Sequence, residues 1–112
     1  MKLSVVHYRT ASGKVPYQEW LARLRDTTAK AAVTRRIIRI ELHDLGDHRR
    51  VGDGVSELRI AVGPGYRVYF GKVGTRIIVL LCAGDKGSQE RDIAKAKTYW
   101  SDHQRRYEQS QD

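Results

Sequence analysis

The chain has little of what stabilises secreted and membrane proteins. Its 112 residues include one cysteine and two prolines. The single thiol, Cys82, excludes an internal disulfide, and its place after the apolar run 77–81 predicts a buried structural residue. That run is far shorter than the roughly 20 apolar residues of a membrane-spanning helix, and the first residues lack a signal-peptide core. We therefore expect a cytoplasmic protein that makes no membrane contact.

Negative charge is also scarce. The chain has 13 acidic residues against 21 basic ones, which leaves a formal charge of +8. Such an excess favours nucleic acid or an acidic protein as partner, and the alternative is a solvated basic surface that binds nothing in particular. A hydrophobic fraction of 40% argues against disorder. The length fits one domain, which we place at residues 1–104, followed by a polar tail over 105–112 that is expected to fray.

Three successive β-strands are predicted over residues 55–62, 66–72 and 75–82. Apolar and polar residues alternate from Glu57 to Val62, and the glycines around Pro64 form a turn. A symmetric three-residue loop pairs 62 with 66, 60 with 68 and 58 with 70. One face of the sheet then carries Leu58, Ile60, Val62, Tyr66, Val68 and Phe70. The other face carries Arg59, Ala61, Arg67 and Tyr69, and this polar face is the candidate functional surface. The last strand has no clean alternation, which predicts that both of its faces are covered.

Helices are predicted on both sides of these strands in the sequence. A strand over residues 3–8 comes first, and Pro16 suits the first turn of a helix whose apolar stripe is Tyr17, Trp20, Leu21 and Leu24. Residues 26–28 can cap a second helix, which Gly46 is expected to end, and residues 46–54 read as a polar connection. Ser88 is expected to cap a final helix. The order β-α-α-β-β-β-α predicts an α+β fold, a mainly antiparallel sheet packed against a helical hairpin and a C-terminal helix.

A set of short motifs occurs in a definite order along the chain. The set comprises Tyr17, Trp20, Leu21 and Leu24, then Glu57-Leu58-Arg59, residues 65–70 (GYRVYF), residues 84–89 (GDKGSQ), Asp92-Ile93 and Ala96. Together these motifs resemble the RelE/ParE superfamily of toxins from type II toxin–antitoxin modules. The nearest likeness is to the HigB-like branch, also described as phage Gp49-like addiction module killer proteins.

The resemblance implies a small RelE-like fold and a toxin that is silenced by a cognate antitoxin, in this branch often a helix-turn-helix (HigA-like) protein. RelE-like and HigB-like members cut mRNA in the ribosomal A site, whereas ParE-like members poison DNA gyrase. Matching the nuclease positions of the family assigns Arg59 before the turn, Arg67 after it, and Lys86 near the last helix. Some relatives carry two lysines where this chain has Glu57 and Arg59, and a catalytic tyrosine where it has Asp92.

The chemistry implied by the resemblance is attack of a ribose 2′-hydroxyl on the adjacent phosphate, which needs no metal, and we expect no cofactor. Arginine offers phosphate two parallel donors and stays charged, so Arg67 is assigned to the scissile phosphate and Arg59 to the same or a neighbouring one. Tyr69, expected opposite Arg59, is assigned to base stacking or proton relay, and Lys86 to charge or general acid catalysis. The general base stays unassigned. The alternative is that both arginines are solvated or bind acidic side chains such as Glu57.

Further basic and aromatic residues are predicted to contact RNA, namely Arg35, Arg39, Arg91, Lys95 and Tyr99. The leading hypothesis is therefore a ribosome-dependent mRNA endoribonuclease, monomeric when free of antitoxin. A second hypothesis is a toxin of the same fold without nuclease activity, acting on gyrase or another protein. The third is a non-toxic basic module that binds nucleic acid or an antitoxin.

Overall fold

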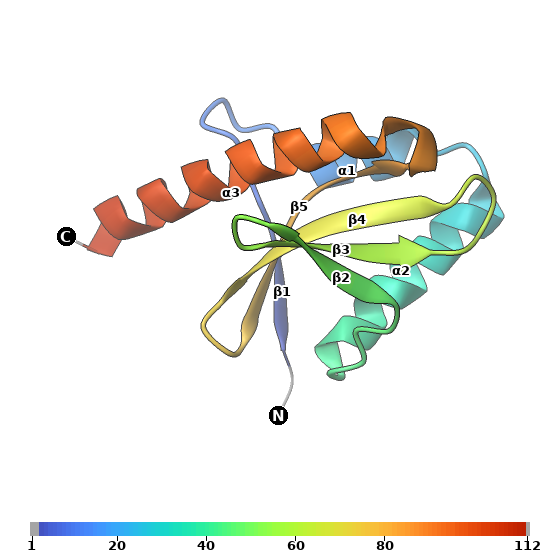
Figure 1. The fold of residues 1–112 in the computed structure, drawn as a ribbon, viewed down its shortest axis with the longest axis horizontal. Helices are drawn as coiled ribbons and strands as arrows, with labels where there is room; N and C mark the ends of the chain where they lie inside the picture. Colours follow the sequence, from blue (N-terminus) through green and yellow to red (C-terminus); the bar gives the residue numbers. More distant parts are fainter. Residues whose placement is uncertain (1–2, 112) are drawn as a thin grey trace.

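A computed structural model describes residues 3–111 as an α+β protein with a five-stranded mixed sheet and three helices (Figure 1). The elements in chain order are β1 (Ser4–His7), α1 (Pro16–Arg23), α2 (Thr27–Glu41), β2 (His48–Gly52), β3 (Val55–Ile60), β4 (Tyr66–Val73), β5 (Ile77–Asp85), the 3₁₀ turn η1 (Lys86–Ser88) and α3 (Gln89–Gln111). The strands lie in the order β1-β5-β4-β3-β2. β1 pairs with β5 in parallel, and all other neighbours are antiparallel.

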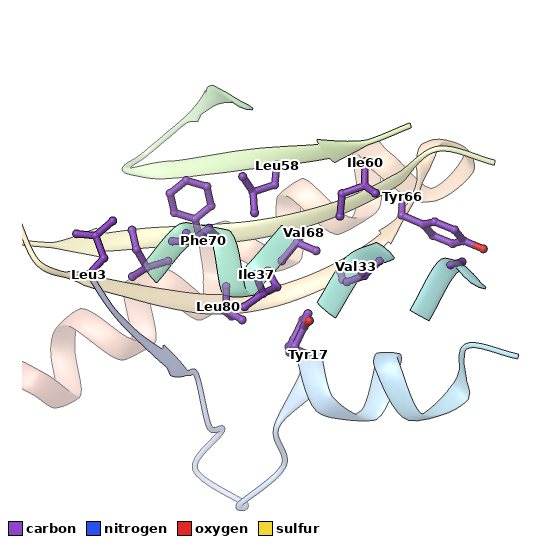
Figure 2. Close-up of a cluster of buried hydrophobic side chains, with 14 residues drawn as sticks. Leu3, Tyr17, Val33, Ile37, Leu58, Ile60, Tyr66, Val68, Phe70 and Leu80 are labelled. Carbon is purple, nitrogen blue, oxygen red and sulfur yellow. The ribbon is translucent and has the colours of Figure 1, made fainter. Parts of the chain in front are cut away.

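The two faces of the sheet are covered by different helices. Helices α1 and α2 pack on the face that carries Leu58, Val68 and Leu80, and Figure 2 shows Tyr17 of α1 and Val33 and Ile37 of α2 directed toward these strand residues. Helix α3 covers the opposite face, where Ala96 and Trp100 pack with Val55, Tyr69 and Leu81. β5 is buried along most of its length, which confirms the prediction that both faces of this strand are covered.

The start of each early helix follows from its sequence. Pro16 occupies the first turn of α1, where its missing N–H costs no hydrogen bond. Asp26 caps α2, since its Oδ1 accepts hydrogen bonds from the backbone N–H of Thr28 at 3.0 Å and of Ala29 at 3.1 Å. Both starts were predicted from the sequence.

The predicted end of α2 at Gly46 is wrong. The helix ends at Glu41, and His43 adopts the left-handed conformation with φ 66°. Gly46 also has a positive φ, but its role is to make room for Arg36, whose guanidinium would lie 2.6 Å from an added Cβ. The Arg36 side chain donates to the carbonyls of Leu45 and Asp47, both at 2.8 Å, and so fixes the chain after the helix.

The prediction of a polar connection over residues 46–54 is also wrong, because residues 48–52 form strand β2. This strand pairs with β3 through a turn in which Gly52, Asp53 and Gly54 all have positive φ. β2 lies at the sheet edge, and its residues are exposed except for the half-buried Val51. Its sequence therefore lacks the apolar alternation that identifies half-buried strands.

The predicted register between β3 and β4 is wrong by two residues, although every side chain lies on the predicted face. The structure pairs Ile60 with Tyr66, Leu58 with Val68 and Ser56 with Phe70. A wider turn causes the shift, since Val62 N–H donates to the Ile60 carbonyl and Gly65 N–H to the Val62 carbonyl. A shift of two preserves the alternation of faces but changes every cross-strand partner.

Helix α3 continues to Gln111, beyond the boundary at residue 104 that the sequence predicted for the domain. Tertiary contacts reach this part of the helix, because the Arg106 side chain donates to the Arg9 carbonyl and its guanidinium lies 5.5 Å from the centre of the Tyr8 ring. Within the described residues, each helix is too short or too polar to cross a membrane.

Candidate functional site

Two arginines lie directly opposite each other on β3 and β4. Arg59 pairs with Arg67 across the two strands, at the end of the hairpin close to its turn. Directly opposed side chains on one face of a sheet have Cβ atoms about 5 Å apart, so the two positive charges share one small region. Like charges in this position are destabilising unless other groups compensate for them.

A buried glutamate compensates for one of them. Glu57 is fully buried (0% exposed), and its Oε1 accepts from Arg67 Nη1 at 3.0 Å and from Arg49 Nε at 3.1 Å. Its other oxygen, Oε2, accepts from Gln89 Nε2 at 2.9 Å. We call Glu57, Arg49, Arg67 and Gln89 the Glu57 cluster; it joins β2, β3, β4 and the first turn of α3.

The cluster keeps Glu57 ionised. Burial alone would raise the pKa of its carboxyl group, but the hydrogen bonds from Gln89 and Arg49 and the charge of Arg67 outweigh burial and lower it below its ordinary value. The Arg67 side chain is 12% exposed, so only a small part of it reaches the surface. Its Nε is buried and has no hydrogen-bond partner within the residues whose side chains are described, 3–107.

Arg59 has a looser environment. Its Nη2 lies 2.9 Å from Asp47 Oδ1, and both side chains are largely solvated (40% and 59% exposed). Its backbone carbonyl accepts a hydrogen bond of 2.7 Å from the buried Arg36, which ties the strand to α2. The backbone of Arg59 is thus fixed, while its guanidinium is held only by an exposed ion pair.

Tyr69 is not placed as predicted. Its cross-strand partner is Glu57 and not Arg59, and the residue is fully buried (0% exposed) beneath α3. Burial, followed by the negative charge of Glu57, raises the pKa of its hydroxyl strongly. Its burial leaves no ring face on which a base could stack. Tyr69 instead lies beside Glu57 in the interior.

Lys86 lies at the start of η1, close to the arginine pair in the fold. Gly84 of β5 pairs with Arg67, and Lys86 follows two positions later with an exposed side chain. The turn is stabilised by Asp85, whose Oδ1 accepts from the backbone N–H of Gly87 at 2.8 Å and of Ser88 at 3.2 Å. Asp85 therefore caps this turn. Ser88, which the sequence predicted as the cap of the final helix, is the last residue of η1 and forms a capping box with Asp85.

The residues predicted to contact RNA fall into two separate groups. Arg91, Lys95 and Tyr99 lie on α3 and line one cleft. Arg35 and Arg39 lie on α2, which covers the other face of the sheet, and Arg39 forms an exposed ion pair with Asp44. The structure brings the first three together and separates them from the other two.

Sequence reasoning missed part of this site. Glu57 was considered only as an alternative partner of the arginines, Gln89 was named only within the motif over residues 84–89 and given no role, and Arg49 was not considered. Arg49 lies on the edge strand that the sequence did not reveal, and Gln89 reaches Glu57 from 32 residues away. The one available signal was the acidic side chain of Glu57 at a position that alternates with Leu58 and Ile60 on the same strand as Arg59.

Comparison with known proteins identifies one relationship. No protein-family model matches the chain. An uncharacterized protein of Haemophilus influenzae is 43% identical over 81 residues, which cover 72% of this chain and 82% of that protein. At this identity and coverage, the chain belongs to the same family as the Haemophilus influenzae protein.

Proposed function

We propose that this protein is the toxin of a type II toxin–antitoxin module, of the RelE/ParE superfamily and its HigB-like branch, and that it cuts mRNA on the ribosome. The observation that carries the proposal is the cross-strand pair Arg59–Arg67. Two adjacent guanidinium groups offer parallel charged donors to the oxygens of a phosphodiester, which supports such a ligand at this pair.

The arrangement around Arg67 supports a role in phosphate binding. Glu57 holds one terminal nitrogen of the side chain, so its orientation is set before any ligand arrives. Fixed donors aimed at the place where negative charge develops are the largest contribution in many enzymes, because they need no rearrangement during the reaction. In the proposed reaction Arg67 stabilises the scissile phosphate, and the more exposed Arg59 binds the same phosphate or its neighbour.

The remaining roles follow from position. Lys86 lies near enough in the fold to add positive charge or to protonate the leaving 5′-oxygen. No proton acceptor for the 2′-hydroxyl is assigned, because Glu57 is buried and fully hydrogen-bonded and Tyr69 is buried beneath α3. The order of elements supports a RelE-like fold with β2 as an additional edge strand.

The partner proposals rest on the same resemblance and on charge. A cognate antitoxin of the HigA-like, helix-turn-helix kind is the proposed inhibitor, and a net charge of +8 suits an acidic segment of it. The free toxin is proposed to be a cytoplasmic monomer that meets its mRNA on the ribosome.

The test is to map new mRNA 5′ ends after induction of the protein, with and without an inhibitor of translation. Arg67→Ala is a poor variant by itself, because it leaves the buried Glu57 with one charged partner fewer and weakens the fold. Arg67→Lys keeps the charge but loses the planar pair of donors, so we expect at least a ten-fold loss of cutting with the fold retained by circular dichroism.

The outcomes separate three functions. New 5′ ends that require translating ribosomes and disappear in Arg67→Lys support the nuclease. Growth arrest without new ends indicates a protein target such as gyrase. If the protein causes no growth arrest and no cutting, a basic binding module is the function that remains. Either of these last two results refutes the proposal.

A further inference from the structure

A cleft beside α3 is lined by residues other than those of the Glu57 cluster. Its volume is about 390 Å³, within the range of small-molecule sites. The walls are α1 and the loop before it, the end of β5, and the first turns of α3. We call it the α1–α3 cleft, and the side chains that matter here are Lys14, Trp20, Arg23, Arg91, Lys95 and Tyr99.

The basic residues of the cleft are not neutralised by the protein. Lys14, Arg23, Arg91 and Lys95 all line it, and none forms an ion pair within residues 3–107, the part of the chain with described side chains. All four side chains are exposed. Each of these four side chains can offer charged hydrogen-bond donors to an anion.

Two of the three carboxylates in the cleft are already engaged. Asp85 accepts the two backbone hydrogen bonds that shape η1, and Asp92 is buried and accepts from the Ser88 hydroxyl. Only Glu19 remains without a hydrogen bond or ion pair from a described side chain. Four basic and three acidic side chains therefore line the cleft, and the four basic ones, which are exposed and form no ion pair within residues 3–107, are the groups available to an anionic ligand.

Aromatic rings complete the walls. Tyr99 is half-buried and stacks on Tyr8 with ring centroids 4.9 Å apart, and Trp20 is half-buried with its ring edge-on to Tyr66 at 5.8 Å. Both rings are held by these contacts, and both line the cavity. Fixed, partly exposed aromatic rings beside cations are the combination on which nucleotide bases stack.

The cleft and the Glu57 cluster are separate sites on one helix. Gln89 points from the first turn of α3 to Glu57, whereas Arg91 and Lys95 line the cleft. Gly84 lies between them, pairing with Arg67 on β4 and lining the cleft from β5. An RNA chain bound at Arg67 would therefore have a second anion site close by, around the start of α3.

We propose that the α1–α3 cleft binds one nucleotide through its phosphate, with the base against Trp20 or Tyr99. The assignment of that nucleotide to an RNA chain rests on the proposed function; the same chemistry would also hold a free nucleotide. Arg91 and Lys95 are the residues chosen to test it, because both are exposed on a helix and can be replaced without disturbing the core.

The test uses the purified protein alone, followed by ¹⁵N NMR during titration with adenosine 5′-monophosphate, adenosine, or inorganic phosphate. We expect the monophosphate to shift the amides of Gly84, Arg91 and Lys95 and the Trp20 indole, and adenosine to bind at least ten-fold more weakly. Arg91→Gln with Lys95→Gln should weaken the monophosphate about ten-fold or more, because each lost contact is a charged hydrogen bond.

The matched control is Lys30→Gln with Arg35→Gln, which removes the same charge from α2 on the other side of the sheet. Equal weakening in both double variants would indicate general attraction to a basic protein and overturn the proposal, as would the absence of shifts at the cleft. Tighter binding of a short oligoribonucleotide than of the monophosphate, at the same amides, assigns the site to an RNA chain; equal binding assigns it to a free nucleotide.

This experiment contains no ribosome, so its result is independent of mRNA cutting. If the protein binds the nucleotide at the cleft but does not cut mRNA, the proposed function is refuted and the nucleotide site still stands. If it cuts mRNA but binds no nucleotide at the cleft, the nucleotide site is refuted and the proposed function still stands.

Discussion

The Glu57 cluster and the α1–α3 cleft, which both involve the start of α3, differ in how their basic side chains are paired. In the Glu57 cluster, a buried carboxylate binds Arg49 and Arg67, and the exposure of Arg67 falls to 12%. In the α1–α3 cleft, four exposed basic side chains have no ion pair within residues 3–107. Arginines held in place are suited to chemistry, which needs donors already in position, whereas exposed and unpaired basic side chains are suited to binding an anion from solution.

The largest expected effect comes from removing the buried ion pair of the Glu57 cluster. Glu57→Gln removes the negative charge that compensates Arg67, and loss of one partner of a buried ion pair costs about 3 kcal/mol or more. The measurement is the free energy of unfolding in urea at pH 7.

The control is Asp47→Asn, which removes the carboxylate from Arg59 on the same sheet face. That pair is exposed, so a loss of less than about 1 kcal/mol is expected. Similar losses for the two variants would mean that Glu57 does not hold the cluster together.

A second prediction concerns the glycine between the two sites. In Gly84→Ala the new Cβ would lie 1.8 Å from Asp92 Oδ2 and 2.7 Å from Ser88 Oγ, so the start of α3 must move away from β5. Overpacking of this kind costs roughly 1–3 kcal/mol. Urea unfolding measures the cost, and the NMR spectrum should show changes at both sites.

Gly87→Ala, two residues beyond Asp85, provides the comparison. Its Cβ would meet Asp85 Oδ1 at 3.2 Å, a contact that a small shift relieves, so its cost should be clearly smaller. If Gly84→Ala were tolerated equally well, the contact between β5 and α3 would be looser than the structure indicates.

A third prediction follows from the lowered pKa of Glu57. A carboxyl group whose pKa is lower in the folded state binds its proton more readily when unfolded, so it stabilises the fold above its unfolded pKa. This contribution is lost as the pH falls from about 4.5, the ordinary value, through the lower folded pKa of Glu57. The stability difference between the wild type and Glu57→Gln should therefore shrink with acid, by at most about 1.4 kcal/mol per pH unit.

Urea unfolding of both proteins between pH 3 and about 7 measures this difference. The pKa values of Asp44 and Asp102 are lowered too, mainly by hydrogen bonds from Arg39 and Tyr8, but both groups remain in the variant and cancel in the comparison. A stability difference that stays constant over this range would contradict an ionised, stabilising Glu57.

Much of the fold is predictable from the sequence, because local patterns determine it. The faces of Leu58 and Val68 follow from alternation alone, which a register shift of two residues leaves intact. Pro16 and Asp26 mark the starts of helices by local chemistry. The partner of Arg59 was not predictable, because hydrogen bonds within the turn 61–65 set the register.

The candidate site was less accessible for the same reason. Arg59 and Arg67 were selected from the sequence, but the carboxylate that orients Arg67 is completed by Gln89 of a distant helix and Arg49 of an edge strand without apolar alternation. For Tyr69 the sequence predicted the correct face of the sheet, but it did not predict that α3 covers this face and buries the side chain. Sequence patterns indicate which face a residue occupies, but only tertiary packing decides whether that face is open.

The smallest effect, and the one that compares the two faces most directly, is the salt dependence of RNA binding. Each phosphate contact in single-stranded RNA contributes about 0.7 to the slope of log affinity against log salt concentration. Arg91 lies in the α1–α3 cleft, so Arg91→Gln should lower the slope by about this amount. Arg39 lies on the far side of the sheet and is paired with Asp44, so Arg39→Gln should leave the slope unchanged, although the sequence placed both residues in the RNA surface. Binding of a short oligoribonucleotide over a series of salt concentrations measures both slopes. Equal reductions would mean that RNA wraps around the domain to both faces, and a change for Arg39 alone would move the RNA surface to α2.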